Sequence, residues 1–86
     1  MVYTLLIKRQ AKKTLQSLSR PDRNRITEKI FRLGANPDDA TLDVKLLQGQ
    51  PFYRLRVGDW RIIYIKDNIV KVISIEKVLP RGGAYK

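Results

Sequence analysis

The chain has 86 residues, of which 43% are hydrophobic, and its 18 Lys and Arg outnumber its 8 Asp and Glu to give a formal net charge of +10. A chain of this length can bury one small core, and its apolar content favours a folded domain over a disordered tail. The absence of Cys excludes disulfides, a thiol nucleophile and a zinc–thiolate site, and the absence of His excludes acid–base catalysis by imidazole. The strong positive charge favours a polyanionic partner, and nucleic acid is the first candidate.

Metals, cofactors and membranes are not expected. Glu28 and Glu76 are the only glutamates and the aspartates are scattered, so the sequence predicts no metal site and no cofactor. No apolar run approaches the length of about 18 residues that a membrane-spanning helix needs. The start, residues 1–4, lacks the basic and apolar regions of a signal peptide. We therefore expect a cytoplasmic protein that does not contact a membrane.

The first half of the chain predicts a strand followed by a helix. Residues 2–7 are rich in the β-branched and aromatic types that strands prefer. Residues 8–18 then switch to helical spacing, because Ala11, Leu15 and Leu18 fall on one apolar stripe.

A second helix is predicted over residues 21–34. Pro21 suits its first turn, where the missing N–H would have no partner in any case. Its apolar residues recur at helical spacing: Ile26, Ile30 and Leu33. Gly34 and then Pro37 are expected to end it. Each helix carries one apolar stripe, which predicts an antiparallel helical pair.

The second half of the chain predicts a sheet. The candidate strands are residues 44–47, 53–57, 60–66 and 69–77. Gly58-Asp59 and Asp67-Asn68 are typical of two-residue hairpin turns. The order β-α-α-β-β-β predicts an α+β fold class, in which a helical hairpin packs on one face of a mostly antiparallel sheet. We expect residues 1–86 to form a single domain.

The Gly58-Asp59 turn predicts which residues face each other across the first hairpin. One face is then wholly apolar or aromatic and should lie under the helices: Tyr53, Leu55, Val57, Trp60, Ile62 and Tyr64. The other face should be open and carry Arg54, Arg56, Arg61, Ile63 and Ile65. Arg56 should lie directly opposite Arg61, which costs about 0.2–1 kcal/mol and suggests that an anion binds there.

The Asp67-Asn68 turn extends this register to the last strand. It predicts that Ile73 meets Ile62, that Ile75 meets Trp60 and that Ser74 meets Arg61. The open face then has a basic end, made of Arg54, Arg56, Arg61, Ser74 and Glu76, and an apolar end, made of Ile63, Ile65, Val70 and Val72. The basic end either binds an anion or is a solvated patch neutralised by Glu76 or Asp59. The apolar end either binds a protein partner or packs on the tail of the chain itself.

Three segments of the sequence resemble a known family. They are Lys45-Leu46-Leu47 with Gly49, the stretch Tyr53-Arg54-Leu55-Arg56-Val57-Gly58-Asp59-Trp60-Arg61-Ile62-Ile63-Tyr64, and the ending Pro80-Arg81-Gly82-Gly83-Ala84-Tyr85-Lys86. Together they resemble the RelE toxins of the RelE/ParE toxin–antitoxin superfamily, and the ending is most similar to archaeal RelE-type toxins. The predicted order of elements agrees with that family along the whole chain.

The resemblance implies a toxin that enters the ribosomal A site, contacts ribosomal RNA and cuts the mRNA there without a metal. The 2′-hydroxyl attacks the adjacent phosphate, and a RelB-like antitoxin normally inhibits the toxin. The implied site residues are Arg61, Arg81, Tyr85 and Arg56 for catalysis and Arg54 for RNA binding, with Lys45 as a further RNA contact. Arg54 and Arg56 stand where some members have lysine, and Leu79 stands where some have arginine. Because arginine releases a proton far less readily than lysine, a base at either strand position is not expected.

Two other functions stay open at this point. A ParE-like toxin shares the fold but inhibits DNA gyrase by binding, without chemistry. A plain RNA-binding module would use the same basic patch with no activity at all. The joint presence of Arg61, Arg81 and Tyr85 favours RNA cleavage.

Overall fold

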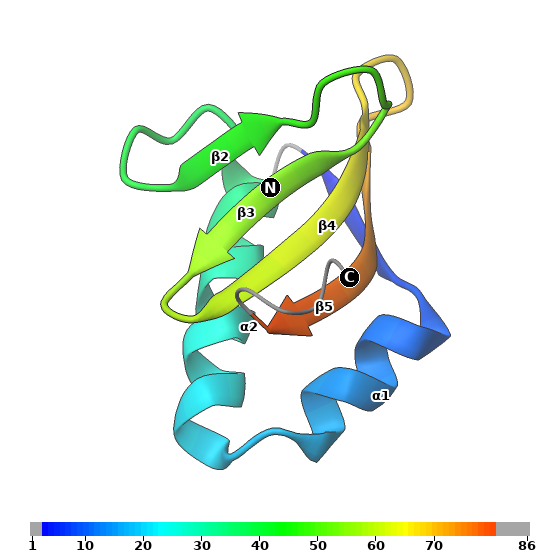
Figure 1. Cartoon of the computed structure of the whole chain (residues 1–86). Coiled ribbons are helices and arrows are strands. Elements are labelled where there is room, and N and C mark those ends of the chain that lie inside the picture. The colour runs from blue at the N-terminus through cyan, green and yellow to red at the C-terminus, as the bar shows by residue number, and fades with distance from the viewer. Residues whose placement is uncertain (1–2, 81–86) are drawn as a thin grey trace.

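The computed structural model describes residues 3–80 and has the expected α+β fold class (Figure 1). The elements follow in the order β1 (Thr4–Ile7), α1 (Arg9–Ser17), α2 (Arg20–Ala35), β2 (Asp43–Leu46), β3 (Tyr53–Val57), β4 (Trp60–Asp67) and β5 (Val72–Pro80). The five-stranded sheet has the strand order β1-β5-β4-β3-β2. β1 runs parallel to β5 and all other neighbours are antiparallel. The predicted order β-α-α-β-β-β is therefore confirmed.

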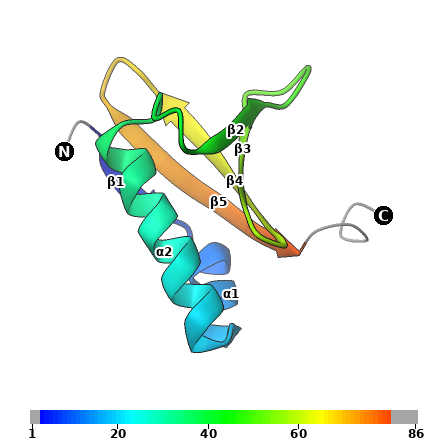
Figure 2. The same cartoon turned by 90° about the vertical axis from the view of Figure 1, so that its left-hand side faces the viewer.

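Both helices lie on the same face of the sheet, and no helix of residues 3–80 covers the opposite face, which we call the open face (Figure 2). The predicted helical stripes point into the core, since Ala11, Leu15, Ile26, Ile30 and Leu33 are all buried. They meet the covered face of the sheet, where Leu55, Val57, Ile62, Tyr64, Ile73, Ile75 and Val78 are buried in the same cluster. In residues 3–80, neither helix is long and apolar enough to cross a membrane.

The start of α2 follows the sequence signals, and its end differs from them. The side chain of Ser19 accepts a hydrogen bond from the Asp22 backbone N–H, and proline follows within the first helical positions. Gly34 does not end the helix but lies inside it, and the helix continues to Ala35. A Cβ at Gly34 would lie 2.9 Å from Leu5 Cγ, so this glycine is needed for the close approach of α2 to β1.

The register of the β3–β4 hairpin is confirmed residue by residue. Leu55 pairs with Ile62, Val57 with Trp60, and Arg56 lies directly opposite Arg61. Gly58 has φ +58, the positive value that the first position of a tight hairpin turn requires. The six residues predicted for the covered face belong to the core or pack against it.

The prediction for the next hairpin was wrong, because its turn is longer. Residues 68–71 form the turn and β5 begins at Val72 instead of residue 69. The carboxylate of Asp67 accepts hydrogen bonds from the backbone N–H groups of Ile69 (2.9 Å) and Val70 (3.2 Å), which closes the longer turn. Lys71 completes it with φ +59.

The longer turn and an irregularity in β5 change the predicted neighbours. Ser74 lies opposite Ile65 instead of Arg61, and Leu79 takes the place opposite Arg61. Ile62 pairs with Val78 instead of Ile73, and Trp60 pairs with Pro80 instead of Ile75. Because Ile63 pairs with Lys77 and Tyr64 with Ile75, Glu76 is the extra residue of a β-bulge.

The predicted apolar end of the open face is also corrected. Val70 lies in the exposed turn rather than in the sheet, and Val72 lies opposite Asp67 at the start of β5. Ile63 is buried. The four residues therefore do not form one continuous exposed strip.

Candidate nucleic-acid interface

The open face carries its basic residues in two cross-strand rows. In one row Lys45 of β2 lies opposite Arg54 of β3, and Arg54 lies opposite Ile63 of β4. In the next row Asp43 lies opposite Arg56, Arg56 opposite Arg61, and Arg61 opposite Leu79. Each row depends on the alternation of side chains along a strand, which puts residues 54, 56 and 61 on one face.

Lys45, Arg54 and Arg61 converge on one hollow of about 410 Å³, which we call the basic hollow. Its other lining residues are Leu46, Leu47, Gln48 and Gln50. Guanidinium groups bind phosphate oxygens through two parallel N–H···O bonds, and lysine adds a mobile point charge. The arrangement is thus suited to bind a phosphate and the polar groups around it.

One carboxylate already contacts this cluster. Arg54 Nη2 donates to Asp43 Oδ1 at 3.0 Å, and the Arg54 side chain is 18% exposed. Its Nε is buried and has no acceptor among residues 3–80. A buried donor of this kind gains from an incoming acceptor such as a phosphate oxygen.

Glu76 does not appear in an ion pair with any arginine of the described chain. It accepts a hydrogen bond from Ser74 Oγ at 2.7 Å. Arg54 forms an ion pair with Asp43, and Arg32 forms one with Asp39. One interpretation of the sequence was that Glu76 neutralises the patch, but the contact that this carboxylate makes in the described chain is with Ser74.

The other predicted site residues differ in their placement. Arg56 is half-buried opposite Arg61 but does not line the basic hollow. Arg81 and Tyr85 lie outside the described residues. The roles of all these residues stay predictions. Within residues 3–80 no group of three or more His, Cys, Asp or Glu comes together in a way that could hold a metal ion.

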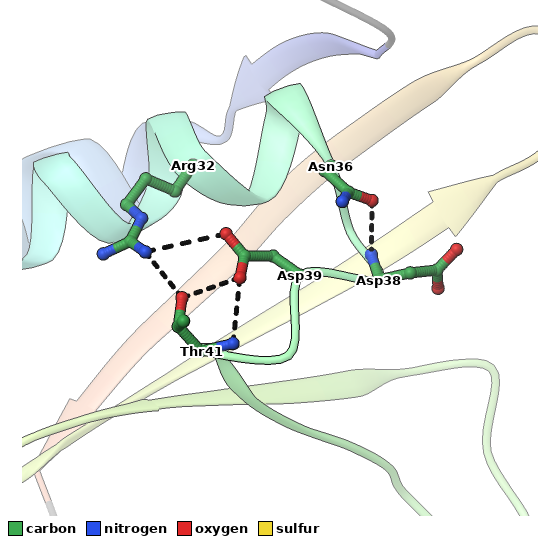
Figure 3. Close-up of polar contacts among 5 residues, drawn as sticks. All are labelled: Arg32, Asn36, Asp38, Asp39 and Thr41. Atoms are coloured by element: carbon green, nitrogen blue, oxygen red, sulfur yellow. Dashed lines mark hydrogen bonds and ion pairs between the residues drawn. The ribbon is translucent and has the colours of Figure 1, made fainter.

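The loop between α2 and β2 leads the chain to the edge strand that carries Lys45, and a small polar cluster shapes it (Figure 3). The carboxylate of Asp39 accepts from the Thr41 backbone N–H (2.8 Å) and from Thr41 Oγ1 (2.7 Å), and Arg32 contacts it at 3.6 Å. Arg32 also donates to Thr41 Oγ1. The hydrogen bonds from Thr41, aided by the charges of Arg32 and Lys29, hold the pKa of Asp39 below its ordinary value of 3.8.

The sequence prediction missed the contribution of the β2–β3 loop. Gln48 and Gln50 line the basic hollow, although Lys45 was the one site residue predicted in this part of the chain. Gly49, with φ +74, lets the loop turn between them. The signal available in the sequence was a Gly-Gln-Pro turn directly before a basic strand.

Comparison with known proteins identifies the family. Residues 5–85 match the family described as the ParE toxin of the type II toxin–antitoxin system parDE. The chain therefore belongs to this family of toxins, and within it to the RelE type, as the relatives below show.

One curated relative and one solved structure carry that assignment. A protein of Methanocaldococcus jannaschii named "Putative toxin RelE1" is 32% identical over 88 residues, which cover 100% of this chain and 98% of the relative. The toxin in the crystal structure of the archaeal RelE–RelB complex from Pyrococcus horikoshii is 39% identical, with a TM-score of 0.85 over 98% of this chain and 100% of that one. The RelBE complex of E. coli, at 19% identity and a TM-score of 0.77, covering 93% of this chain and 98% of that one, shares the fold. The predicted resemblance to RelE toxins is thus confirmed.

Proposed function

We propose that this toxin is a metal-independent, ribosome-dependent mRNA endonuclease that cuts the message in the A site and so inhibits translation. The observation that carries the proposal is the convergence of Lys45, Arg54 and Arg61 on the basic hollow. The formal charge of +10 supports an RNA partner as well. The ribosome and its mRNA would be met in the cytoplasm, and residues 1–86 would act as one toxin domain.

The proposed reaction needs no enzyme nucleophile. The 2′-oxygen of the RNA forms a bond to the adjacent phosphorus while the bond from phosphorus to the 5′-oxygen breaks. The 2′-hydroxyl loses its proton and the 5′-oxygen gains one, which leaves a cyclic phosphate and a 5′-hydroxyl. What the protein must supply is in-line positioning and stabilisation of the negative charge on the phosphorane.

Each candidate residue receives a role in this reaction. Arg61 and Arg81 bind the scissile phosphate, and Arg54 with Lys45 binds the flanking RNA backbone. Arg56, directly opposite Arg61, assists the departure of the 5′-oxygen. Tyr85 stacks on a base or takes part in proton transfer. These roles follow the family resemblance and the chemistry of guanidinium groups.

The inhibitor proposed for this toxin is a RelB-like antitoxin. The relative from Pyrococcus horikoshii was crystallised as a RelE–RelB complex. A chain in the RelB–RelE complex from Methanococcus jannaschii is 27% identical to this one, with a TM-score of 0.76, and the match covers 93% of this chain and 94% of that chain. An antitoxin with an acidic segment would complement the basic open face.

Primer extension on a translated message, with purified toxin and ribosomes, tests the proposal. We expect the message to be cut within codons, and only when ribosomes are present. Cutting should persist at EDTA concentrations that leave the ribosome assembled. It should become much weaker as the salt concentration is raised. A message that stays intact, together with inhibition of gyrase supercoiling, would instead support the alternative of a ParE-like gyrase inhibitor. RNA binding without cleavage of the message and without inhibition of gyrase would show that the protein is a plain RNA-binding module.

A further inference from the structure

A second hollow lies beside the basic hollow on the open face. It measures about 190 Å³, and we call it the apolar hollow. Its lining residues are Leu47, Gln50, Phe52, Ile63, Glu76, Lys77 and Leu79. Leu47 and Gln50 line both hollows, so the two adjoin. The loop between β2 and β3, which carries both residues, projects from the sheet on the side away from the helices (Figure 2).

The bulge in β5 explains why two charged residues stand at this apolar surface. Ile75 and Val78 both face the core, so the two residues between them, Glu76 and Lys77, are left to the open side. Bulges commonly redirect a side chain in this way. Ser74 Oγ donates to Glu76 Oε2 at 2.7 Å, which orients the half-buried carboxylate.

We propose that the apolar hollow binds one nucleobase of the RNA whose phosphate occupies the basic hollow, and that Glu76 selects bases with an exocyclic amino group over uracil. The inference rests on the proposed function and adds the base preference of the same site. Proteins bind unpaired bases by stacking them on aromatic rings and reading their polar edges. Phe52, Ile63 and Leu79 supply the apolar surface.

The selection follows from the chemistry of a carboxylate. When it is ionised, it can accept hydrogen bonds but cannot donate them. The amino group of cytosine donates to such a group. Uracil offers a single N–H that lies between two carbonyl oxygens, and both of these repel the carboxylate. Cytosine and uracil have rings of equal size, so they test the hydrogen bond without changing the fit.

The surroundings favour a nucleobase over an apolar side chain of a protein partner. Glu76, Lys77 and Gln50 give the rim hydrogen-bonding groups that an aliphatic side chain would leave without partners. The adjoining basic hollow would attract the phosphate attached to that base, because it is lined by Lys45, Arg54 and Arg61.

The test compares the binding of short single-stranded oligocytidylate and oligouridylate to the full-length toxin, by fluorescence anisotropy. Both probes carry 2′-O-methyl groups, so that they cannot be cleaved. We expect the toxin to prefer the cytosine probe about fivefold. The isosteric variant Glu76→Gln should bring that ratio close to one, since an amide both donates and accepts.

Glu28→Gln is the matched control. It makes the same chemical change at the only other glutamate, which is exposed on α2 and therefore on the helical side of the sheet. It should keep the cytosine preference of the wild type. Phe52→Ala should weaken both probes by a similar factor, and circular dichroism checks that each variant is folded.

The outcomes separate this inference from the proposed function. Equal affinity of the wild type for both probes, or an unchanged ratio in Glu76→Gln, would overturn it. So would a Phe52→Ala variant that loses affinity for an antitoxin while binding both probes normally, because the hollow would then dock a protein. If the base preference holds but ribosomes with toxin leave every message intact, the base-binding hollow is supported and the cleavage proposal fails.

Discussion

Arg61 and Ile62 are neighbours in β4, and their side chains lie on opposite faces of the sheet. Ile62 is fully buried between Leu55 of β3 and Val78 of β5, whereas Arg61 lines the basic hollow between Arg56 and Leu79. The covered face thus gathers apolar area against the helices, and the open face gathers positive charge. The stability and the proposed activity of this toxin therefore depend on alternate residues of the same strand.

The largest effect on stability is expected from Ile62→Ala. Truncating a fully buried isoleucine removes apolar contacts and leaves a cavity, which costs about 2–5 kcal/mol of unfolding free energy. Chemical denaturation followed by circular dichroism measures it. A cost below about 1 kcal/mol would show that the covered face is not the core of the protein.

The converse variant, Arg61→Ala, should leave the fold intact and impair cleavage. Losing a charge-assisted hydrogen bond to phosphate costs about 1.5–3 kcal/mol, which corresponds to a cleavage rate roughly 10- to 150-fold lower. The same loss is expected for Arg81→Ala. Primer extension with ribosomes gives the rate, and Arg9→Ala, at an exposed arginine that begins α1, is the control. Cleavage at the wild-type rate in Arg61→Ala would place the site elsewhere.

A smaller effect on the covered face is expected from Tyr64→Phe. Tyr64 stacks on Tyr53 with ring centroids 5.3 Å apart, and its buried hydroxyl has no hydrogen-bond partner among residues 3–80. On folding, this hydroxyl loses its hydrogen bonds to water and gains none from the described residues. Removing it should therefore leave the free energy of unfolding unchanged or raise it by up to about 1 kcal/mol at neutral pH.

The same variant gives a test by pH. Burial raises the pKa of Tyr64 above its ordinary value of 10.0, so the unfolded chain ionises there before the folded one does. The stability that Tyr64 contributes is complete below that value and is lost as pH rises through and beyond it. Tyr64→Phe should therefore lose less stability than the wild type in melts above pH 10. Equal losses in both proteins would mean that the hydroxyl reaches water.

The smallest effect is expected at the loop that leads to the open face. Because its pKa is lowered, the Asp39 carboxylate stabilises the fold above its ordinary pKa of 3.8, and that contribution disappears as pH falls through the lower value of the folded state. Asp39→Ala should thus be slightly less stable than the wild type at neutral pH, and the difference should vanish in strong acid. Thermal melts over a pH series measure it.

Asp38→Ala is the matched control for that variant. The carboxylate of Asp38 points away from the cluster of Arg32, Asp39 and Thr41 (Figure 3). It should show no comparable difference at neutral pH. A pH-independent gap between Asp39→Ala and the wild type would mean that Asp39 acts through packing of the loop rather than through its charge.

The two hairpins show which turns and strand registers can be predicted from local sequence patterns and which cannot. Gly58-Asp59 sets a two-residue turn by backbone preference alone, so the opposition of Arg56 and Arg61 followed from the sequence and was confirmed. Asp67-Asn68 looked equivalent, but the Asp67 carboxylate caps a longer turn, and Tyr3, directly before β1, donates to Asn68 Oδ1 at 2.7 Å. That last contact spans most of the chain and cannot be read from local pattern.

The candidate site divides in the same way. Lys45, Arg54 and Arg61 were each predicted from the sequence as site residues. The alternation of side chains along β3 and β4 was enough to place the two arginines on one face. Their convergence with Lys45 depends on the pairing of β2 with β3 and on the loop between them. The apolar hollow depends on the bulge at Glu76, for which the sequence offered no signal.

The element order, the helical stripes, the covered face of the first hairpin and the family could all be predicted from the sequence, because periodicity, tight turns and short motifs are properties of neighbouring residues. The register of β5, the tight contact of Gly34 with Leu5 and the two adjoining hollows of the open face became visible in the folded protein alone. The physical reason is that these features arise where segments far apart in the chain pack together. There the best burial of apolar area and the pairing of polar groups are settled jointly rather than residue by residue.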